Sequence, residues 1–178
     1  MATFRQLHKF GGSSLADPEC YLRVVNILKE YSSATDLVVV SAAGKTTNRL
    51  IEFVEALDKD GRIAHECLQN LRQFQLELIE ALLEGEPAEQ LTATIQQEFT
   101  ALGELTAPLS EAQKAQVLGH GEVWSSRLLA ALLCQHDLQA VAQDARAFLR
   151  AEVGAQPEVD RARSYPCLLY TSPSPRDS

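Results

Sequence analysis

Apolar and polar residues follow one another along the chain in patterns that predict three short strands. Residues 5–10 (RQLHKF) alternate loosely and end at two glycines, and residues 36–42 (DLVVVSA) contain four consecutive apolar positions. A continuous apolar run of this kind is typical of a parallel strand that is buried on both faces. A third apolar segment, residues 138–142, predicts another strand nearer the C-terminus.

In most of the remaining sequence, apolar residues recur at helical spacing and predict helices. Asp17 is placed to cap a helix that starts at Pro18, and Leu22, Val25 and Leu28 follow at helical spacing. A strand, a glycine turn, a helix and a second strand make a βαβ unit, so the first 42 residues predict an α/β sheet. Further helices are expected at about 48–59, 63–82, 88–105 and 122–135. Another is expected to begin at Ser110, which can form a capping box with Gln113.

Composition restricts the class of protein. The 178 residues include 16 Lys+Arg and 24 Asp+Glu, a formal net charge of −8, and 46% of them are hydrophobic. This length and apolar content fit one folded domain, and the acidic balance argues against a nucleic-acid partner. No apolar run approaches the ~20 residues of a membrane-spanning helix, and the N-terminus has no signal-peptide pattern. We therefore expect a cytoplasmic protein without a membrane or nucleic-acid partner.

The cysteines and the C-terminal residues carry no predicted function. Cys20, Cys67, Cys134 and Cys167 are scattered without the spacing of a zinc site, so we expect reduced thiols and no metal centre. Residues 167–178 (CLLYTSPSPRDS) are rich in Ser and Pro and lack periodicity. They resemble a stray translated end, so we expect a folded unit over 1–166 and a disordered, non-native tail over 167–178.

The first candidate site follows the first predicted strand, in KFGGSS (residues 9–14). Lys9 ends the strand, and Gly11 and Gly12 let the backbone approach an anion while the next helix points its N-terminus toward it. This arrangement can hold a polyphosphate. The alternative is a simple strand-to-helix turn with a solvated lysine.

The second candidate site, SAAGKTTN (residues 41–48), follows the second predicted strand, where open α/β sheets bind ligands. Its GKTT substring resembles a P-loop, but the glycine that a P-loop requires five residues before Gly44 is Val39 here. A structural role is also open, because Thr46 or Thr47 can cap the following helix.

The third candidate site is GHGEVWSS (residues 119–126). Glu122 opens a helix, where a carboxylate either complements the helix dipole or faces a cleft and binds a substrate ammonium. We expect His120 to make a local hydrogen bond and Trp124 to pack in the core. Farther on, Asp144 begins either another cleft loop or a short helix that it caps.

Taken in order, these segments resemble the aspartokinase family. Its successive landmarks are KFGGSS, VVVSAAGKTTN, GHGEVWSSRLLAALL and DARAFLRAE, over about residues 5–166. The resemblance is nearest to the aspartokinase portion of methionine-linked bifunctional aspartokinase/homoserine dehydrogenases. It implies an α/β fold of the amino-acid-kinase (carbamate-kinase-like) type, an αβα sandwich, of which this chain would be the N-terminal lobe with a helical insertion.

The resemblance also implies the activity and the site. The reaction would be ATP-dependent phosphorylation of L-aspartate to 4-phospho-L-aspartate in lysine, methionine and threonine biosynthesis, with Mg²⁺ accompanying ATP. The parent protein would be a homo-oligomer and would use NADP only if it carries a dehydrogenase half. Lys9 would be the catalytic residue, and the ATP phosphates would be held by Lys9, Phe10, Gly11, Gly12 and Ser13. Aspartate would be bound by Ser41, Gly44, Thr47 and, at its α-ammonium, Glu122.

Three departures from the family pattern matter. Val123 and Trp124 stand where many aspartokinases have an arginine after the glutamate, and Lys45 is unusual in its loop. The Gly-Arg-Asn-Gly-Ser-Asp-like segment and the adenine-binding half do not appear in the 178 residues. We therefore expect no kinase turnover from this chain alone and an exposed strand edge that favours association.

Other interpretations stay open at this point. The chain could be another kinase of the same fold that acts on a different carboxylate or carbamate, or a P-loop-type nucleotide-binding module built on AAGKTT. It could also be a helical interaction module carried by residues 63–105.

Overall fold

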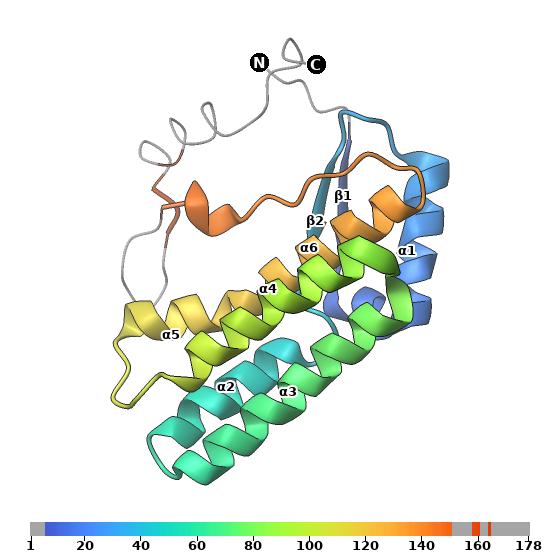
Figure 1. The fold of residues 1–178 in the computed structure, drawn as a ribbon. Helices are drawn as coiled ribbons and strands as arrows, with labels where there is room; N and C mark the ends of the chain where they lie inside the picture. The colour runs from blue at the N-terminus through green and yellow to red at the C-terminus, as the bar shows by residue number, and fades with distance from the viewer. Residues whose placement is uncertain (1–5, 151–157, 161–163, 165–178) are drawn as a thin grey trace.

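A computed structural model describes residues 6–150, 158–160 and 164. Within them, two parallel strands are paired in register, β1 (Leu7–Phe10) with β2 (Leu37–Val40). Figure 1 shows this small sheet behind the end of a set of longer helices, with α1 connecting the two strands. The helices are α1 (Pro18–Tyr31), α2 (Thr46–Leu57), α3 (Gly61–Leu82), α4 (Gly85–Gly103), α5 (Glu111–Leu118) and α6 (His120–Gln135), with 3-10 turns η1 (Gly12–Leu15) and η2 (Ala145–Ala147).

Local capping explains where several helices begin. The Asp17 side chain accepts a hydrogen bond from the Cys20 backbone N–H at 2.8 Å, and Pro18 follows as the first residue of α1. Ser110 and Gln113 form both hydrogen bonds of the predicted capping box at the start of α5. These two helix starts are therefore confirmed.

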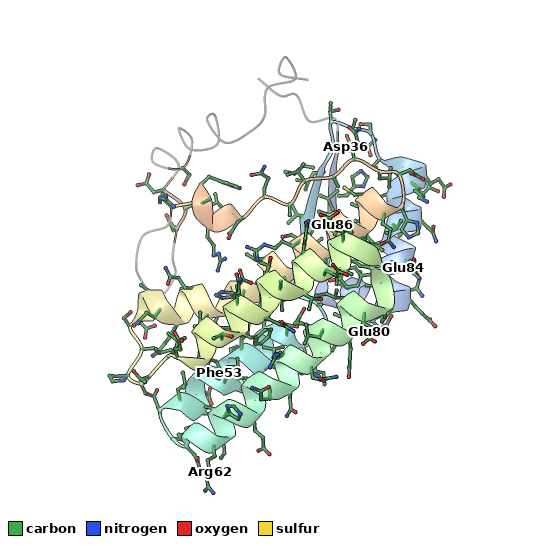
Figure 2. All side chains as sticks on the ribbon, viewed as in Figure 1. Asp36, Phe53, Arg62, Glu80, Glu84 and Glu86 are labelled. Carbon is green, nitrogen blue, oxygen red and sulfur yellow. The ribbon has the colours of Figure 1, made fainter. Side chains whose placement is uncertain are left out.

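The hydrophobic core lies among the helices. Fully buried side chains on α3, α4 and α6 include Leu71, Ile95 and Trp124, and Phe53 on α2 points in among its neighbours (Figure 2). The result is a largely helical unit with a small parallel sheet, in agreement with the expected N-terminal lobe of an α/β fold with a helical insertion. No described helix has the length and apolarity that a membrane span requires.

The sheet is covered on one face, which corrects the expectation that the second strand is buried on both. Val38 and Val40 pack against the helical core together with Phe10. On the other face, Leu37 and Val39 are 38% and 40% exposed. An apolar run shows that a strand can be buried, but it does not specify how many faces its neighbours cover.

Two further expectations differ from the structure. Residues 138–142 form no strand and pair with neither described strand, and Val141 is 77% exposed. On α1, the predicted positions Val25 and Leu28 are buried together with Tyr21 and Val24, whereas Leu22 is exposed. The buried face therefore includes two of the three predicted positions. The predicted tail, 167–178, lies outside the described residues.

The two faces of β2 predict different responses to the same substitution. Val38→Thr places a hydroxyl against the core and should lower the free energy of unfolding by about 1–2 kcal/mol. Val39→Thr, on the exposed face, should change it by less than ~0.5 kcal/mol. Urea unfolding of the two variants checks this, and equal losses would contradict the one-sided burial of β2.

Asp36, labelled in Figure 2, connects the beginnings of the two strands. Its carboxylate accepts hydrogen bonds from the Ser33 backbone N–H at 2.8 Å and hydroxyl at 2.9 Å, and from the Gln6 backbone N–H at 3.1 Å. His8 Nε2 lies 3.4 Å away. The Ser33 backbone N–H above all lowers the pKa of Asp36 below its usual value of 3.8.

Asp36→Asn should therefore make the free energy of unfolding less dependent on pH below about pH 4. Because the folded pKa is depressed, the carboxylate contributes its full stability above the unfolded pKa and loses it as the pH falls through the folded pKa, below about pH 4. Unfolding measured at pH 7, 4 and 3 should show a smaller decrease for the variant. An unchanged decrease would assign the acid sensitivity to other carboxylates.

Candidate functional site

The turns that follow β1 and β2 are packed backbone against backbone. A Cβ on Gly12 would lie 2.7 Å from the Ala42 carbonyl oxygen, which is too close for any side chain. The Gly44 N–H donates to the Gly12 carbonyl at 3.0 Å, and the Ser41 N–H donates to the Phe10 carbonyl at 3.0 Å. The first two candidate loops are thus one continuous surface at the carboxyl ends of the parallel strands.

The first turn of α6 packs against the same surface. A Cβ on Gly121 would lie 2.7 Å from the Ala42 Cβ and 3.1 Å from the Thr46 Cγ2. Ser125, one turn later, accepts a hydrogen bond from the Ala43 N–H at 2.8 Å and donates one to the Gly121 carbonyl at 3.0 Å. The structure therefore brings together three glycine-bearing turns that are far apart in the sequence.

A buried amide on α3 supports the second loop. Gln75 Nε2 donates to the Thr46 hydroxyl at 3.1 Å, and both side chains are buried. The expected capping role of Thr46 or Thr47 is wrong, because α2 is preceded by Lys45 without a side-chain cap and the Thr46 hydroxyl binds Gln75 instead. Gly44 has φ +54°, the left-handed region that glycine adopts without strain.

The third turn is held from the side of α4. Trp124 is buried and stacks on Phe99 with ring centroids 4.7 Å apart, as the predicted core role requires. Its indole N–H donates to Glu98 at 2.7 Å, a contact that the sequence analysis missed. His120 Nδ1 lies 2.8 Å from the Gln116 carbonyl, which confirms the expected local hydrogen bond. A buried indole N–H requires an acceptor, and that requirement is the signal that could have led to Glu98.

The predicted charged residues of the site are available for a ligand. Lys9 is exposed on β1 opposite Val39, and Glu122 is exposed in the first turn of α6. Neither forms an ion pair with another described residue. Phe10 packs inward, so only its backbone can face a phosphate, while Ser13 is exposed. The remaining predicted residues, Ser41, Gly44 and Thr47, are half-buried.

Asp144 caps the short turn η2, as one of the two sequence interpretations predicted. It accepts a hydrogen bond from the Arg146 backbone N–H at 2.9 Å and forms an ion pair with its guanidinium at 2.8 Å. That guanidinium lowers the pKa of the Asp144 carboxyl, and the carboxylate in turn raises the pKa of Arg146. The Arg146 Cδ would lie 3.3 Å from a Cβ on Gly119, so this loop borders the third turn.

Tyr21 on α1 packs near Ser125 of α6, beside the glycine-bearing turns. Its side chain is buried on α1, and burial raises the pKa of its phenol, an effect that the nearby Ser125 hydroxyl partly offsets. The phenol nevertheless makes no hydrogen bond within the usual geometric limits. Tyr21 is therefore a neutral packing residue under the loops.

No described His, Cys, Asp or Glu residues form a group of three suited to a metal ion. Two shallow surface hollows among the described residues lie along the helices. One, of about 410 Å³, is lined by residues that include Arg49 and Phe74, and the other, of about 280 Å³, by residues that include Arg72 and Phe99. Neither of these two hollows is lined by Lys9 or Glu122.

Comparisons with known proteins give consistent results. Residues 5–167 match the amino acid kinase family. The chain is 51% identical over 165 residues to bifunctional aspartokinase/homoserine dehydrogenase 2 of Escherichia coli (strain K12), covering 92% of this chain and 20% of that protein. It is 31% identical over 143 residues to lysine-sensitive aspartokinase 3 of the same strain, covering 80% of this chain and 31% of that protein.

A solved structure agrees with these sequence matches. The crystal structure of E. coli aspartokinase III in complex with aspartate and ADP (R-state) superposes with a TM-score of 0.73 at 28% identity, covering 93% of this chain and 37% of that chain. The chain therefore spans between about a fifth and two fifths of the length of these relatives.

Because Gly121 lies so close to Ala42, we expect a glycine-to-alanine substitution to destabilise the protein at this position but not at an open one. Gly121→Ala should lower the free energy of unfolding by about 1–3 kcal/mol, because the new methyl group overlaps Ala42 and Thr46. Gly61→Ala, at the open start of α3, is the matched control and should stabilise by up to ~1 kcal/mol. Denaturant unfolding measures both, and a neutral Gly121→Ala would show that the turns do not pack as described.

Proposed function

The chain belongs to the amino acid kinase family, and we propose that it is the aspartate-binding lobe of an aspartokinase. The whole enzyme would transfer the γ-phosphoryl group of ATP to the side-chain carboxylate of L-aspartate and produce 4-phospho-L-aspartate and ADP. The observation that carries the proposal is the packing of three loops, which bear Lys9, Ser41 and Glu122, around Gly12 and Gly121. The 51% identity to a bifunctional aspartokinase supports it.

On the phosphate side, Lys9 and the backbone N–H groups of Gly11 and Gly12 would bind the triphosphate. Lys9 is exposed and has no ion-pair partner among the described residues, so its ammonium is free to neutralise phosphate charge. The crowded Gly12 position leaves backbone rather than side chain at the surface, which suits close contact with an anion. Phe10 and Ser13 would complete this turn.

On the acceptor side, Glu122 would bind the α-ammonium of aspartate. Its carboxylate is exposed, while Gly121 and Val123 beside it are buried, so the side chain projects from a fixed helix start. Ser41 and Thr47 supply hydroxyl groups, and Gly44 supplies backbone near the reacting carboxylate.

The chemistry requires positioning and charge neutralisation more than proton transfer. A carboxylate oxygen of aspartate attacks the γ-phosphorus, a new O–P bond forms, and the bond to the β,γ-bridging oxygen breaks as ADP leaves. An aspartate carboxylate is already ionised at neutral pH, so the reaction requires no general base. Mg²⁺ would enter with ATP as part of the substrate.

The remaining aspects of the function are inferred from the family resemblance. We place the reaction in lysine, methionine and threonine biosynthesis, in the cytoplasm, and within a parent protein that forms a homo-oligomer. NADP would be used only by a homoserine dehydrogenase half, to which no residue of this chain is assigned. Residues 1–166 would then be the N-terminal part of the kinase domain, without the adenine-binding half.

Ligand binding and turnover test this assignment separately. Saturation-transfer NMR of the purified chain should show binding of L-aspartate and much weaker binding of L-glutamate. An assay for ADP release in the presence of ATP and aspartate should show no turnover. Preference for glutamate would favour another kinase of the same fold, and measurable turnover would show that the chain is a complete catalyst.

Two lysines distinguish the proposed phosphate site from a P-loop. Lys9→Ala should weaken tripolyphosphate binding by roughly 10–100-fold, because it removes a charge-assisted contact. Lys45→Ala, in the AAGKTT segment, should weaken it by less than ~3-fold, because Val39 lies in β2 where a P-loop requires glycine. Isothermal titration calorimetry measures both affinities. The reverse order of effects would favour the P-loop interpretation.

A further inference from the structure

The Glu98 carboxylate on α4 is the common acceptor for two donors on α6. It accepts the Trp124 indole N–H through Oε2 at 2.7 Å and an Arg127 guanidinium N–H through Oε1 at 2.7 Å. Both oxygens are therefore used, and each bond is short enough for a charge-assisted contact. Glu98 is only 22% exposed and Arg127 29% exposed, so the carboxylate is largely shielded from water.

These contacts restrain the start of α6 from one side. Phe99, beside Glu98, stacks on the Trp124 ring, so the indole is fixed both across its face and at its N–H. Trp124 and Arg127 are three residues apart, so the carboxylate connects neighbouring positions on one face of the helix. A rotation of the helix about its axis, or a shift along it, would strain these two bonds.

The second loop restrains α6 from the other side. Gly121 lies against Ala42, and Ser125 binds the Ala43 N–H. Glu122 lies between these two contacts and Trp124 in the sequence, on the first turn of the helix. Its own side chain has no partner among the described residues, so its direction depends on how the helix is held.

We propose that Glu98 is a positioning residue for the Glu122 carboxylate, acting through the Trp124 indole and the Arg127 guanidinium. The identity of the ligand that Glu122 binds, an amino acid with a free α-ammonium, rests on the proposed function. Glu98 belongs to the helical insertion, which here comprises α3 and α4, and not to any of the three glycine-bearing loops. The insertion would thereby contribute to the site without contacting the ligand.

The test compares Glu98→Gln with Glu89→Gln, a matched change at an exposed position on the same helix. Trp124 is the only tryptophan of the chain, so its indole gives a single, unambiguous ¹H–¹⁵N signal. A glutamine has one acceptor oxygen, so one of the two donors loses its partner in Glu98→Gln. We expect the indole and Glu122 amide signals to move and the indole proton to exchange roughly tenfold faster. Glu89→Gln should leave all three unchanged.

Aspartate affinity provides the functional readout. Glu98→Gln should weaken aspartate binding roughly tenfold at a temperature where both proteins are folded, and Glu89→Gln should not. Leu91→Ala removes a buried side chain of α4 two turns from Glu98. It should lower the melting temperature but leave the indole signal and the aspartate affinity unchanged. If Glu98 had only a structural role, aspartate affinity would decrease in step with the melting temperature in all three variants. That result would overturn the proposal.

Two further outcomes are also decisive. If Glu98→Gln does not fold, Arg127→Met removes only one donor, and an unchanged indole signal in that variant would overturn the proposal. If the unmodified chain does not bind aspartate, the proposed function of this lobe fails. The Glu122 amide shift still decides whether Glu98 positions that residue.

Discussion

The structure depends on the absence of a side chain at two positions. At Gly12 and Gly121, a single methyl group would overlap Ala42, in one case at its carbonyl oxygen and in the other at its Cβ. Ala42 therefore lies at the centre of three turns that come from β1, β2 and the α5–α6 junction. Because backbone meets backbone there, small displacements produce clashes, and the loops must move together or not at all.

Buried polar contacts from the helical insertion reinforce this packing. Gln75 on α3 holds Thr46 in the second loop, and Glu98 on α4 holds Trp124 after the third turn. A buried hydroxyl or indole without a partner would be costly, so each contact specifies one arrangement rather than adding much net stability. The insertion is thus part of the architecture of the site, which weakens the interpretation of residues 63–105 as an independent interaction module.

Features that depend on residues close together in the sequence could be predicted, whereas features that depend on long-range contacts could not. Asp17 and Ser110 cap helices through bonds to residues three positions away, and both were found from the sequence. Thr46 has the same local chemistry, but its hydroxyl binds Gln75, 29 residues away, and the local rule failed.

Strand predictions show the same division. Residues 36–42 contain a real strand, but only neighbouring elements determine that one of its faces is exposed. Residues 138–142 have a strand-like composition but pair with neither described strand. The three candidate loops could be recognised because glycine and hydroxyl patterns are local, whereas Glu98 could not be, because its role appears only when α4 lies against α6.

Exposure of Lys9 limits what the described residues can do chemically. Two unit charges 4 Å apart interact by ~1 kcal/mol in water and by ~4 kcal/mol near a protein surface of lower effective dielectric. Lys9 lies on the uncovered face of the sheet, beside Val39, where water weakens its attraction for a phosphoryl group. Strong stabilisation of a transferring phosphoryl group requires a site from which water is excluded. The proposed recognition of aspartate through Glu122 and the glycine-bearing turns does not need that enclosure, so the proposal is consistent with binding in the absence of turnover.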